Sequence, residues 1–192
     1  MKKTKIDANE TLLIFDEIQY ANALVRTPNL PLLSYAEREI FKLYCLDIGL
    51  LSARAALHES VLFELDNKIF SHFRGALTEQ FILQELKAME NLPVYYYASE
   101  RGSAEVDFVI QKNNEIIPIE VKASINLKAK SLKTYMEDFK PQTAIRTSLA
   151  NFSKNETLID IPLYAFAEVI SATILNEGHF HLIDGDSFEN IS

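Results

Sequence analysis

Runs that alternate between apolar and polar residues follow one another through the second half of the chain. Alternation with a period of two is typical of strands, and turn residues separate these runs. We therefore predict strands at 92–99, 104–111, 116–123, 143–149 and 157–161. Helical patterns cover residues 75–90 (GALTEQFILQELKAME) and 128–139, and a further helix begins near Pro162. This order predicts an α/β fold with a mixed central sheet flanked by helices, not a doubly wound parallel sheet.

The first third of the chain has weaker patterns. A buried strand is predicted at 11–15, and an extended connector with two prolines at 21–34. After these we expect a short strand (KLYCLD), a helix after Gly49, and a short helix at 60–70. The organisation that follows is an N-terminal strand and connector at 1–30, an α/β domain at 31–175, and a tail at 176–192 that holds one more short strand.

Strand alternation separates three charged residues from their apolar neighbours. Asp107 lies in the strand at 104–111, and Glu120 and Lys122 lie in the next strand. The apolar sets expected on the opposite faces are Val106, Phe108 and Ile110 in the first strand, and Ile117, Ile119 and Val121 in the second. A hairpin between these strands can therefore bring the three charged side chains onto one face of the sheet. Pro118 removes a ladder donor, so this second strand is expected at an edge or with a bulge.

A fourth charged residue lies on the best predicted helix. Glu79 precedes Ile82, Leu83 and Leu86 by three, four and seven residues, so it shares their apolar stripe and faces the sheet. A carboxylate in that place needs a partner, because burial of an unpaired charge is costly.

Three carboxylates and a lysine suit a hard divalent cation. Mg²⁺, or Mn²⁺ in its place, prefers oxygen ligands, and Mg²⁺ binds through one or two carboxylates, waters and substrate phosphate. We expect Asp107, Glu120 and Glu79 as metal ligands, and Lys122 beside the attacking water. By residue types alone, Glu-x-Lys is common and favours a solvated strand face with salt bridges. The combination with Asp107 across a hairpin and Glu79 on a helix is much rarer.

The run GALTEQFILQEL … VYYYASERGSAEVDFVI … EIIPIEVKAS resembles the PD-(D/E)XK nuclease superfamily. Within it, the chain is similar to the C-terminal domain of a family of prokaryotic AAA-type ATPases, over about residues 30–168. The resemblance implies a restriction-endonuclease-like fold. It matches Asp107 to the metal-binding aspartate, Glu120 and Lys122 to the (D/E)-x-K pair, and Glu79 to the acidic residue of the preceding helix. Most members cut DNA or RNA, and a binding module that keeps the motif without cleavage is the alternative.

The N-terminal run LLIFDEIQ resembles the Walker B strand of the same ATPases, with Asp16 and Glu17 at its end. ATP hydrolysis also needs a phosphate loop, GxxxxGK[ST], and the five glycines of this sequence do not form one. We therefore expect no ATPase activity from this chain. A buried strand that merely ends in two acids is the simpler interpretation of the same residues.

Charge and composition limit the kinds of binding partner that we expect. The net charge of −8 argues against non-specific coating of nucleic acid. Basic residues nevertheless gather between Lys122 and Arg146, so Lys128, Lys130 and Lys133, with Arg101 in a turn near the site, are candidate phosphate contacts; a solvated helix face is the alternative. One cysteine, no membrane-length apolar run and no leader pattern predict a cytoplasmic protein without a membrane partner. The sequence does not distinguish a protein partner from a homo-oligomer.

Overall fold

The computed structural model describes residues 18–55, 68–89, 92–100, 102–125 and 129–175. In chain order its elements are β1 (Ile18–Val25), η1 (Leu32–Tyr35), β2 (Ala36–Cys45), α1 (Ile48–Arg54), α3 (Lys68–Ala88), β3 (Val94–Ala98), β4 (Glu105–Lys112), β5 (Glu115–Val121), α4 (Lys130–Phe139), β6 (Ala144–Ser148), β7 (Ser153–Asn155), β8 (Leu158–Pro162), η2 (Leu163–Ala165) and α5 (Phe166–Leu175). The α/β class predicted from the sequence is confirmed.

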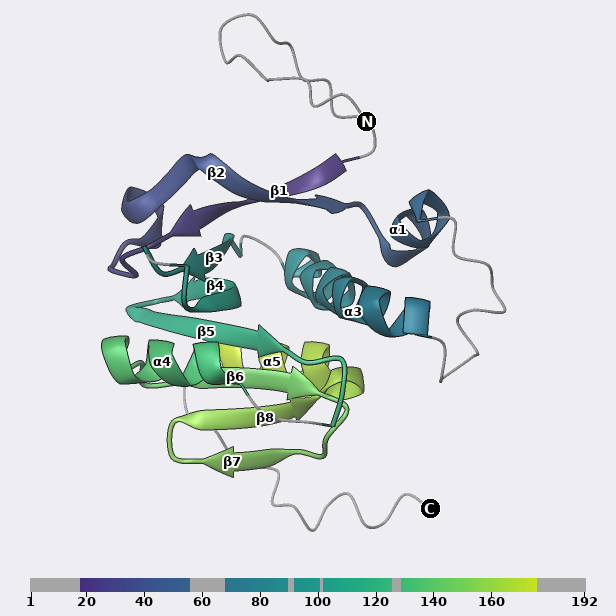
Figure 1. Ribbon diagram of the computed structural model, residues 1–192. Coiled ribbons are helices and arrows are strands. Elements are labelled where there is room, and N and C mark those ends of the chain that lie inside the picture. The colour runs from purple at the N-terminus through teal and green to yellow at the C-terminus, as the bar shows by residue number, and fades with distance from the viewer. Residues whose placement is uncertain (1–17, 56–67, 90–91, 101, 126–128, 176–192) are drawn as a thin grey trace, which may run out of the picture.

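The strands form one mixed sheet in the order β2-β1-β3-β4-β5-β6-β8-β7, which descends the view in Figure 1. The β1–β2, β3–β4, β4–β5 and β7–β8 pairs are antiparallel, whereas β1–β3, β5–β6 and β6–β8 are parallel. Parallel neighbours cannot be joined by a tight hairpin, so the chain must cross over between them. The crossover between β1 and β3 contains β2, α1 and α3, and the crossover between β5 and β6 contains α4.

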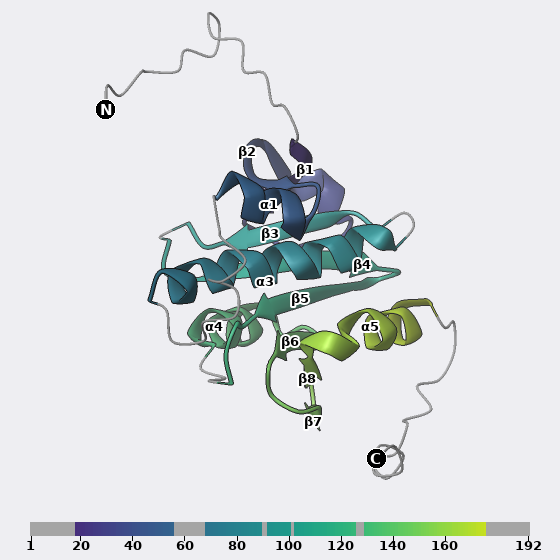
Figure 2. The same ribbon diagram turned by 90° about the vertical axis from the view of Figure 1, so that its right-hand side faces the viewer.

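Two apolar clusters lie on opposite faces of the sheet. On the face called here the α3 face, Ile82, Leu83 and Leu86 of α3 and Phe166 and Ile170 of α5 cover the isoleucine-rich sides of β5, β6 and β8. On the other, the α4 face, Leu132 and Tyr135 of α4 cover parts of β3 and β4. Figure 2 shows α3 lying along β3, β4 and β5, with α1 beside β1 and β2.

A glutamine joins α3 to the end of β2. The Gln80 side chain, 1 % exposed, accepts from the Cys45 N–H at 3.1 Å and donates to the Cys45 carbonyl at 2.9 Å. Both backbone groups at the end of β2 are thereby satisfied away from water. The side chain of Gln84, one turn further on, accepts from the N–H of Ile48 at the start of α1.

Three sequence predictions about the elements are wrong. The connector predicted at 21–34 contains most of β1 and the 3-10 turn η1, since β1 is an inner strand that carries small residues in place of strict alternation. The strand β7 has no counterpart among the predicted strands, because its three residues are all polar and exposed. Helix α3 begins at Lys68, seven residues before the predicted start at Gly75.

The expectation for Pro118 is also wrong. The strand β5 lies inside the sheet between β4 and β6, and its register with β4 is unbroken from Lys112–Glu115 to Phe108–Ile119. Pro118 stands one residue before β5 begins to pair with β6 at Ile119, where a missing N–H is tolerated more easily. The predicted strand at 11–15, the strand in the tail and residues 60–67 of the helix predicted at 60–70 fall outside the described residues, whereas residues 68–70 of that helix belong to α3.

Candidate active site

The candidate residues meet where β4 and β5 separate. The two strands stop pairing after Phe108–Ile119. Beyond that pair, the N–H of Val121 donates to the side chain of Asp107 and not to a backbone carbonyl of β4. The distance from Val121 N to Asp107 Oδ2 is 2.8 Å. This hydrogen bond fixes the carboxylate of Asp107 in the fork between the two strands.

A bulge in β4 gives Asp107 its orientation. Tyr95 of β3 pairs with Val109 and Tyr97 pairs with Val106, so Tyr96 alone stands opposite two residues, Asp107 and Phe108. Such a bulge bends the strand and re-aims side chains, and it is frequent next to active sites. Its consequence corrects the sequence prediction. Val106 joins Val109 in the cluster on the α4 face, not Phe108 and Ile110 on the α3 face.

Glu120 and Lys122 project together, as predicted, from the side of β5 opposite to Ile117, Ile119 and Val121. The Lys122 Nζ donates to Glu120 Oε1 at 2.5 Å. Glu120 is 4 % exposed, and its second oxygen, Oε2, is buried without a hydrogen-bond partner. The carboxylate is thus half satisfied by the protein and has one oxygen left for another electropositive group.

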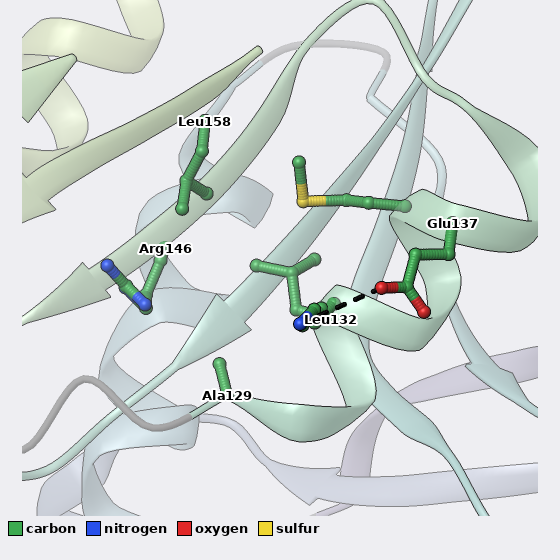
Figure 3. Close-up of a pocket in the computed structure, with 7 residues that line it drawn as sticks. Ala129, Leu132, Glu137, Arg146 and Leu158 are labelled. Carbon is green, nitrogen blue, oxygen red and sulfur yellow. Dashed lines mark ion pairs between the residues drawn. The ribbon is translucent and has the colours of Figure 1, made fainter. Parts of the chain in front are cut away.

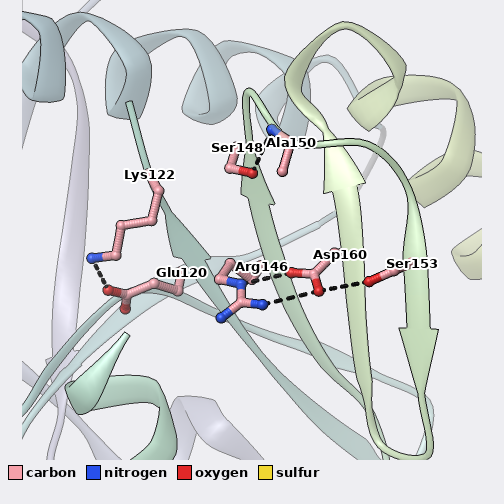
Figure 4. A network of polar contacts seen from close by, with 7 residues as sticks. All are labelled: Glu120, Lys122, Arg146, Ser148, Ala150, Ser153 and Asp160. Carbon is pink, nitrogen blue, oxygen red and sulfur yellow. Dashed lines mark hydrogen bonds and ion pairs between the residues drawn. The ribbon is translucent and has the colours of Figure 1, made fainter. Parts of the chain in front are cut away.

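A row of polar side chains continues from Glu120 across the α4 face (Figure 4). Glu120 stands opposite Arg146 of β6 in the sheet register, and Arg146 stands opposite Asp160 of β8. The Arg146 guanidinium donates from Nε to Asp160 Oδ1 at 2.6 Å and from Nη2 to Asp160 Oδ2 at 2.9 Å. Ser153 of β7 donates to the same carboxylate. A fork-shaped pair of this kind holds the guanidinium plane in one orientation.

Glu79 approaches the fork from α3. Burial raises its pKa to about 7, and the negative charge of Asp107 adds to the rise. Burial and then the charge of Asp107 also raise the pKa of Glu120 to about 7, although Lys122 opposes this. The pKa of Asp107 is itself raised by burial, against the Val121 hydrogen bond. Asp107 therefore interacts with both glutamates, and the negative charge of Glu120 also adds to the rise in the pKa of Glu79.

The β1–β2 hairpin brings to this site two residues that were not among the candidates, Lys42 and Tyr44. Lys42 of β2 forms an ion pair with Glu105 and lies 5.0 Å from the centre of the Tyr96 ring. Burial lowers the pKa of Lys42. The bond to Glu105 and the negative charges of Glu79 and Asp107 together raise it by more than burial lowers it, so the pKa lies above its ordinary value. The hydroxyl of Tyr44, two residues along the same strand, is buried without a partner. The alternation of Lys42 and Tyr44 in a strand was the available signal.

Some of the carboxylate oxygens at the fork are suited to a metal ion. Carboxylate oxygens are hard ligands suited to Mg²⁺. The unpartnered Oε2 of Glu120 and the carboxylate of Asp107 are the atoms that fit such an ion, with Lys122 on the far oxygen of Glu120. Among the described residues, no group of three or more His, Cys, Asp or Glu side chains is arranged to hold a metal ion. Glu79 as a third ligand therefore stays a prediction.

The basic candidates divide into two groups. Lys130 and Lys133 lie on α4, where Lys133 is exposed and its Nζ is 3.8 Å from Glu137 Oε1. Lys128 and Arg101, like Asp16 and Glu17 of the Walker-B-like run, lie outside the described residues.

In the part of the chain that the structure covers, no helix is long and apolar enough to cross a membrane.

The chain matches the model of a protein family over residues 74–166. No curated protein and no solved structure matches the chain. The matched region contains Glu79, Asp107, Glu120 and Lys122, whereas Lys42 and Tyr44 precede it. Residues 74–166 match the family model described as "Domain of unknown function (DUF4143)", a domain found in AAA-ATPase-associated proteins.

Proposed function

We propose that the chain hydrolyses phosphodiester bonds of nucleic acid with Mg²⁺ or Mn²⁺, at the fork between β4 and β5. One observation supports this most. Glu79, Asp107 and Glu120 interact there electrostatically, Lys122 binds one oxygen of Glu120, and the other oxygen is buried without a partner. Such a carboxylate is costly unless a further positive group completes it. The resemblance to PD-(D/E)XK nucleases leads to the same assignment.

Each side chain has a distinct role in the proposal. Asp107 and Glu120 supply the oxygens that hold the cation, and the Val121 N–H and Lys122 orient these two carboxylates. When bound, the cation polarises a phosphoryl oxygen and lowers the pKa of a bound water. The Lys122 ammonium neutralises negative charge that develops on the phosphate. Glu79, with a pKa of about 7, can accept a proton near neutral pH.

The pKa values also predict when the site is ready for a cation. Since the pKa of Glu79 and of Glu120 is about 7, protons compete with the cation below that pH. We therefore expect metal-dependent activity to rise as pH increases through about 7.

Cleavage assays test the proposal. Wild type, Asp107→Ala and Lys122→Ala are incubated with single- and double-stranded DNA and RNA, with Mg²⁺, with Mn²⁺, or with a chelator. The matched control is Lys154→Ala, an exposed lysine on β7 at the far edge of the sheet. We expect metal-dependent cutting by wild type and the control, and a loss of at least a hundredfold in both site variants. No cutting by wild type, or equal cutting by all four proteins, would refute hydrolysis at this site.

A second candidate is an interaction module that keeps this fold without catalysis. Two observations favour it. Within the described ranges no three potential ligands are arranged for a metal, and the net charge of −8 repels phosphate. The discriminating measurement is calorimetric titration of wild type and Asp107→Ala with Mg²⁺ and with an oligonucleotide. Oligonucleotide binding that persists in both proteins, without any cleavage, would favour the module.

A further inference from the structure

A pocket of about 470 Å³ opens on the α4 face, between α4 and the strands β6 and β8 (Figure 3). Its apolar wall consists of Ala129, Leu132, Met136 and Leu158. Three charged side chains, Lys133, Glu137 and Arg146, complete the lining. Pockets that bind small organic groups fall in this size range and combine an apolar wall with a few polar groups.

The position of the pocket relative to Glu120 is given by Arg146. Arg146 lines the pocket, and it is also the register partner of Glu120 on the neighbouring strand. Neighbouring strands lie about 4.8 Å apart, and both side chains project from the α4 face. A molecule that placed one group at Glu120 would therefore have its next group beside the pocket.

The lining has the chemistry of a site for a nucleobase. A base presents a flat apolar face and a polar edge, so it can lie against Met136 and Leu158 and still form hydrogen bonds at its rim. The Glu137 carboxylate can accept from the amino group of guanine, adenine or cytosine. The guanidinium plane of Arg146, oriented by Asp160, is a surface on which a base can stack. Lys133, exposed at the mouth, can meet the phosphate of the same nucleotide.

From this arrangement we infer that the pocket binds the nucleobase next to the phosphate held at Glu120 and Lys122. The inference rests on the proposed function for its choice of ligand, because that function brings a nucleic-acid strand to Glu120. It adds a contact to the base, which phosphate binding at a metal site does not supply. Single-stranded or unpaired substrate follows as the preferred class, since a stacked and paired base cannot enter the pocket.

A fluorescence experiment tests the base contact directly. The chain contains no tryptophan, so Met136→Trp places a single indole in the pocket, and Tyr164→Trp places one at a side chain that is 85 % exposed and is not part of the pocket lining. Each protein is titrated, with Ca²⁺ in place of Mg²⁺, with a short single-stranded oligonucleotide and with the same strand lacking its bases. We expect the intact strand to quench the indole of Met136→Trp, the base-free strand to leave it unchanged, and Tyr164→Trp to respond to neither.

A second measurement leaves the pocket unaltered. Binding of labelled strands to wild type is followed by anisotropy while one abasic position is moved along the strand. One position should weaken binding about tenfold. Glu137→Ala should reduce that difference, whereas Asp138→Ala, its exposed neighbour outside the pocket lining, should not. Equal binding of strands with and without bases overturns the inference, as does quenching of both indoles alike.

Failure of the inference and failure of the proposed function can be told apart by Lys122→Ala. The double variant carries Lys122→Ala and Met136→Trp. If it no longer cleaves but its indole is still quenched by the intact strand, both the hydrolysis and the base pocket are supported. If the Met136→Trp indole is quenched but wild type does not cleave, the base pocket is supported and hydrolysis is refuted. Cleavage of intact and base-free strands at equal rates leaves hydrolysis and removes the pocket.

Discussion

Replacement of Glu120 by glutamine should stabilise the protein at alkaline pH. The side chain is 4 % exposed and one of its oxygens has no partner, so the ionised form is held in unfavourable surroundings despite Lys122. The pKa of Glu120 is about 7 in the folded chain against 4.5 as its ordinary value. Each pH unit between them corresponds to about 1.4 kcal/mol, so the charge costs the folded state about 3.5 kcal/mol at pH 8.

The sign follows from the direction of the pKa change. A folded-state pKa above the unfolded value means that the stability is fully present below about pH 4.5 and is lost as the pH rises through about 7. Glutamine resembles the protonated carboxyl and does not titrate. The free energy of unfolding of Glu120→Gln should equal that of wild type at pH 4. At pH 8 it should exceed wild type by about 2–3 kcal/mol, since local relaxation reduces the full figure.

Thermal unfolding followed by circular dichroism between pH 4 and pH 8 measures this difference. For a chain of this length it corresponds to a rise in Tm of about 5–10 °C at pH 8. Glu100→Gln, an exposed carboxyl, is the matched control and should follow wild type at every pH. If a cation binds at the site, Mg²⁺ raises the Tm of wild type at pH 8 and leaves Glu120→Gln unchanged. A Tm of Glu120→Gln at or below that of wild type at pH 8 would refute the reasoning.

Three further predictions concern the contacts around the site. Lys42→Ala should lower the free energy of unfolding by about 1 kcal/mol or less in urea titrations, because Glu105 loses its partner but its side chain is half exposed to water. A double-mutant cycle with Glu105→Gln should show coupling of similar size, and the absence of coupling would contradict the pairing. Gln80→Ala should lower the free energy of unfolding by about 2–4 kcal/mol, since two buried backbone groups at the end of β2 lose their partner. Hydrogen exchange of the β2 amides should become faster, and unchanged exchange would disprove the link between α3 and β2. Arg146→Lys should destabilise nearly as much as Arg146→Ala, by about 3 kcal/mol in thermal unfolding, because lysine cannot make both bonds to Asp160; full stability of the lysine variant would show that charge alone suffices.

The local sequence determined the elements that carry the four candidate residues. The predicted strands at 92–99, 104–111 and 116–123 correspond to β3, β4 and β5, since each is a run of β-prone residues bounded by a turn. The projection of Glu120 and Lys122 from one side of β5 followed from a period of two, which an unbroken register with β4 preserves. The apolar stripe of α3 likewise predicted that Ile82, Leu83 and Leu86 would be buried, and they are.

Periodicity failed where a neighbouring strand altered the register. The bulge opposite Tyr96 inserts one residue into β4, so that Val106 and Phe108 lie on opposite faces although they are two positions apart. Nothing in the sequence of β4 alone marks the bulge, because it is a property of the pairing with β3. The inner place of β5, with Pro118 in it, depends in the same way on where β6 begins to pair.

The sequence by itself determined which charged residues share a helix face or a strand face, because those relations depend on backbone geometry within one element. Only the tertiary structure decided what stands opposite them. The β1–β2 hairpin brings Lys42 to Glu105 and Asp107, which lie more than sixty residues further along the chain, and β6 places Arg146 beside Glu120. The raised pKa values have the same origin, since burial and the approach of several carboxylates arise when α3 packs on the sheet.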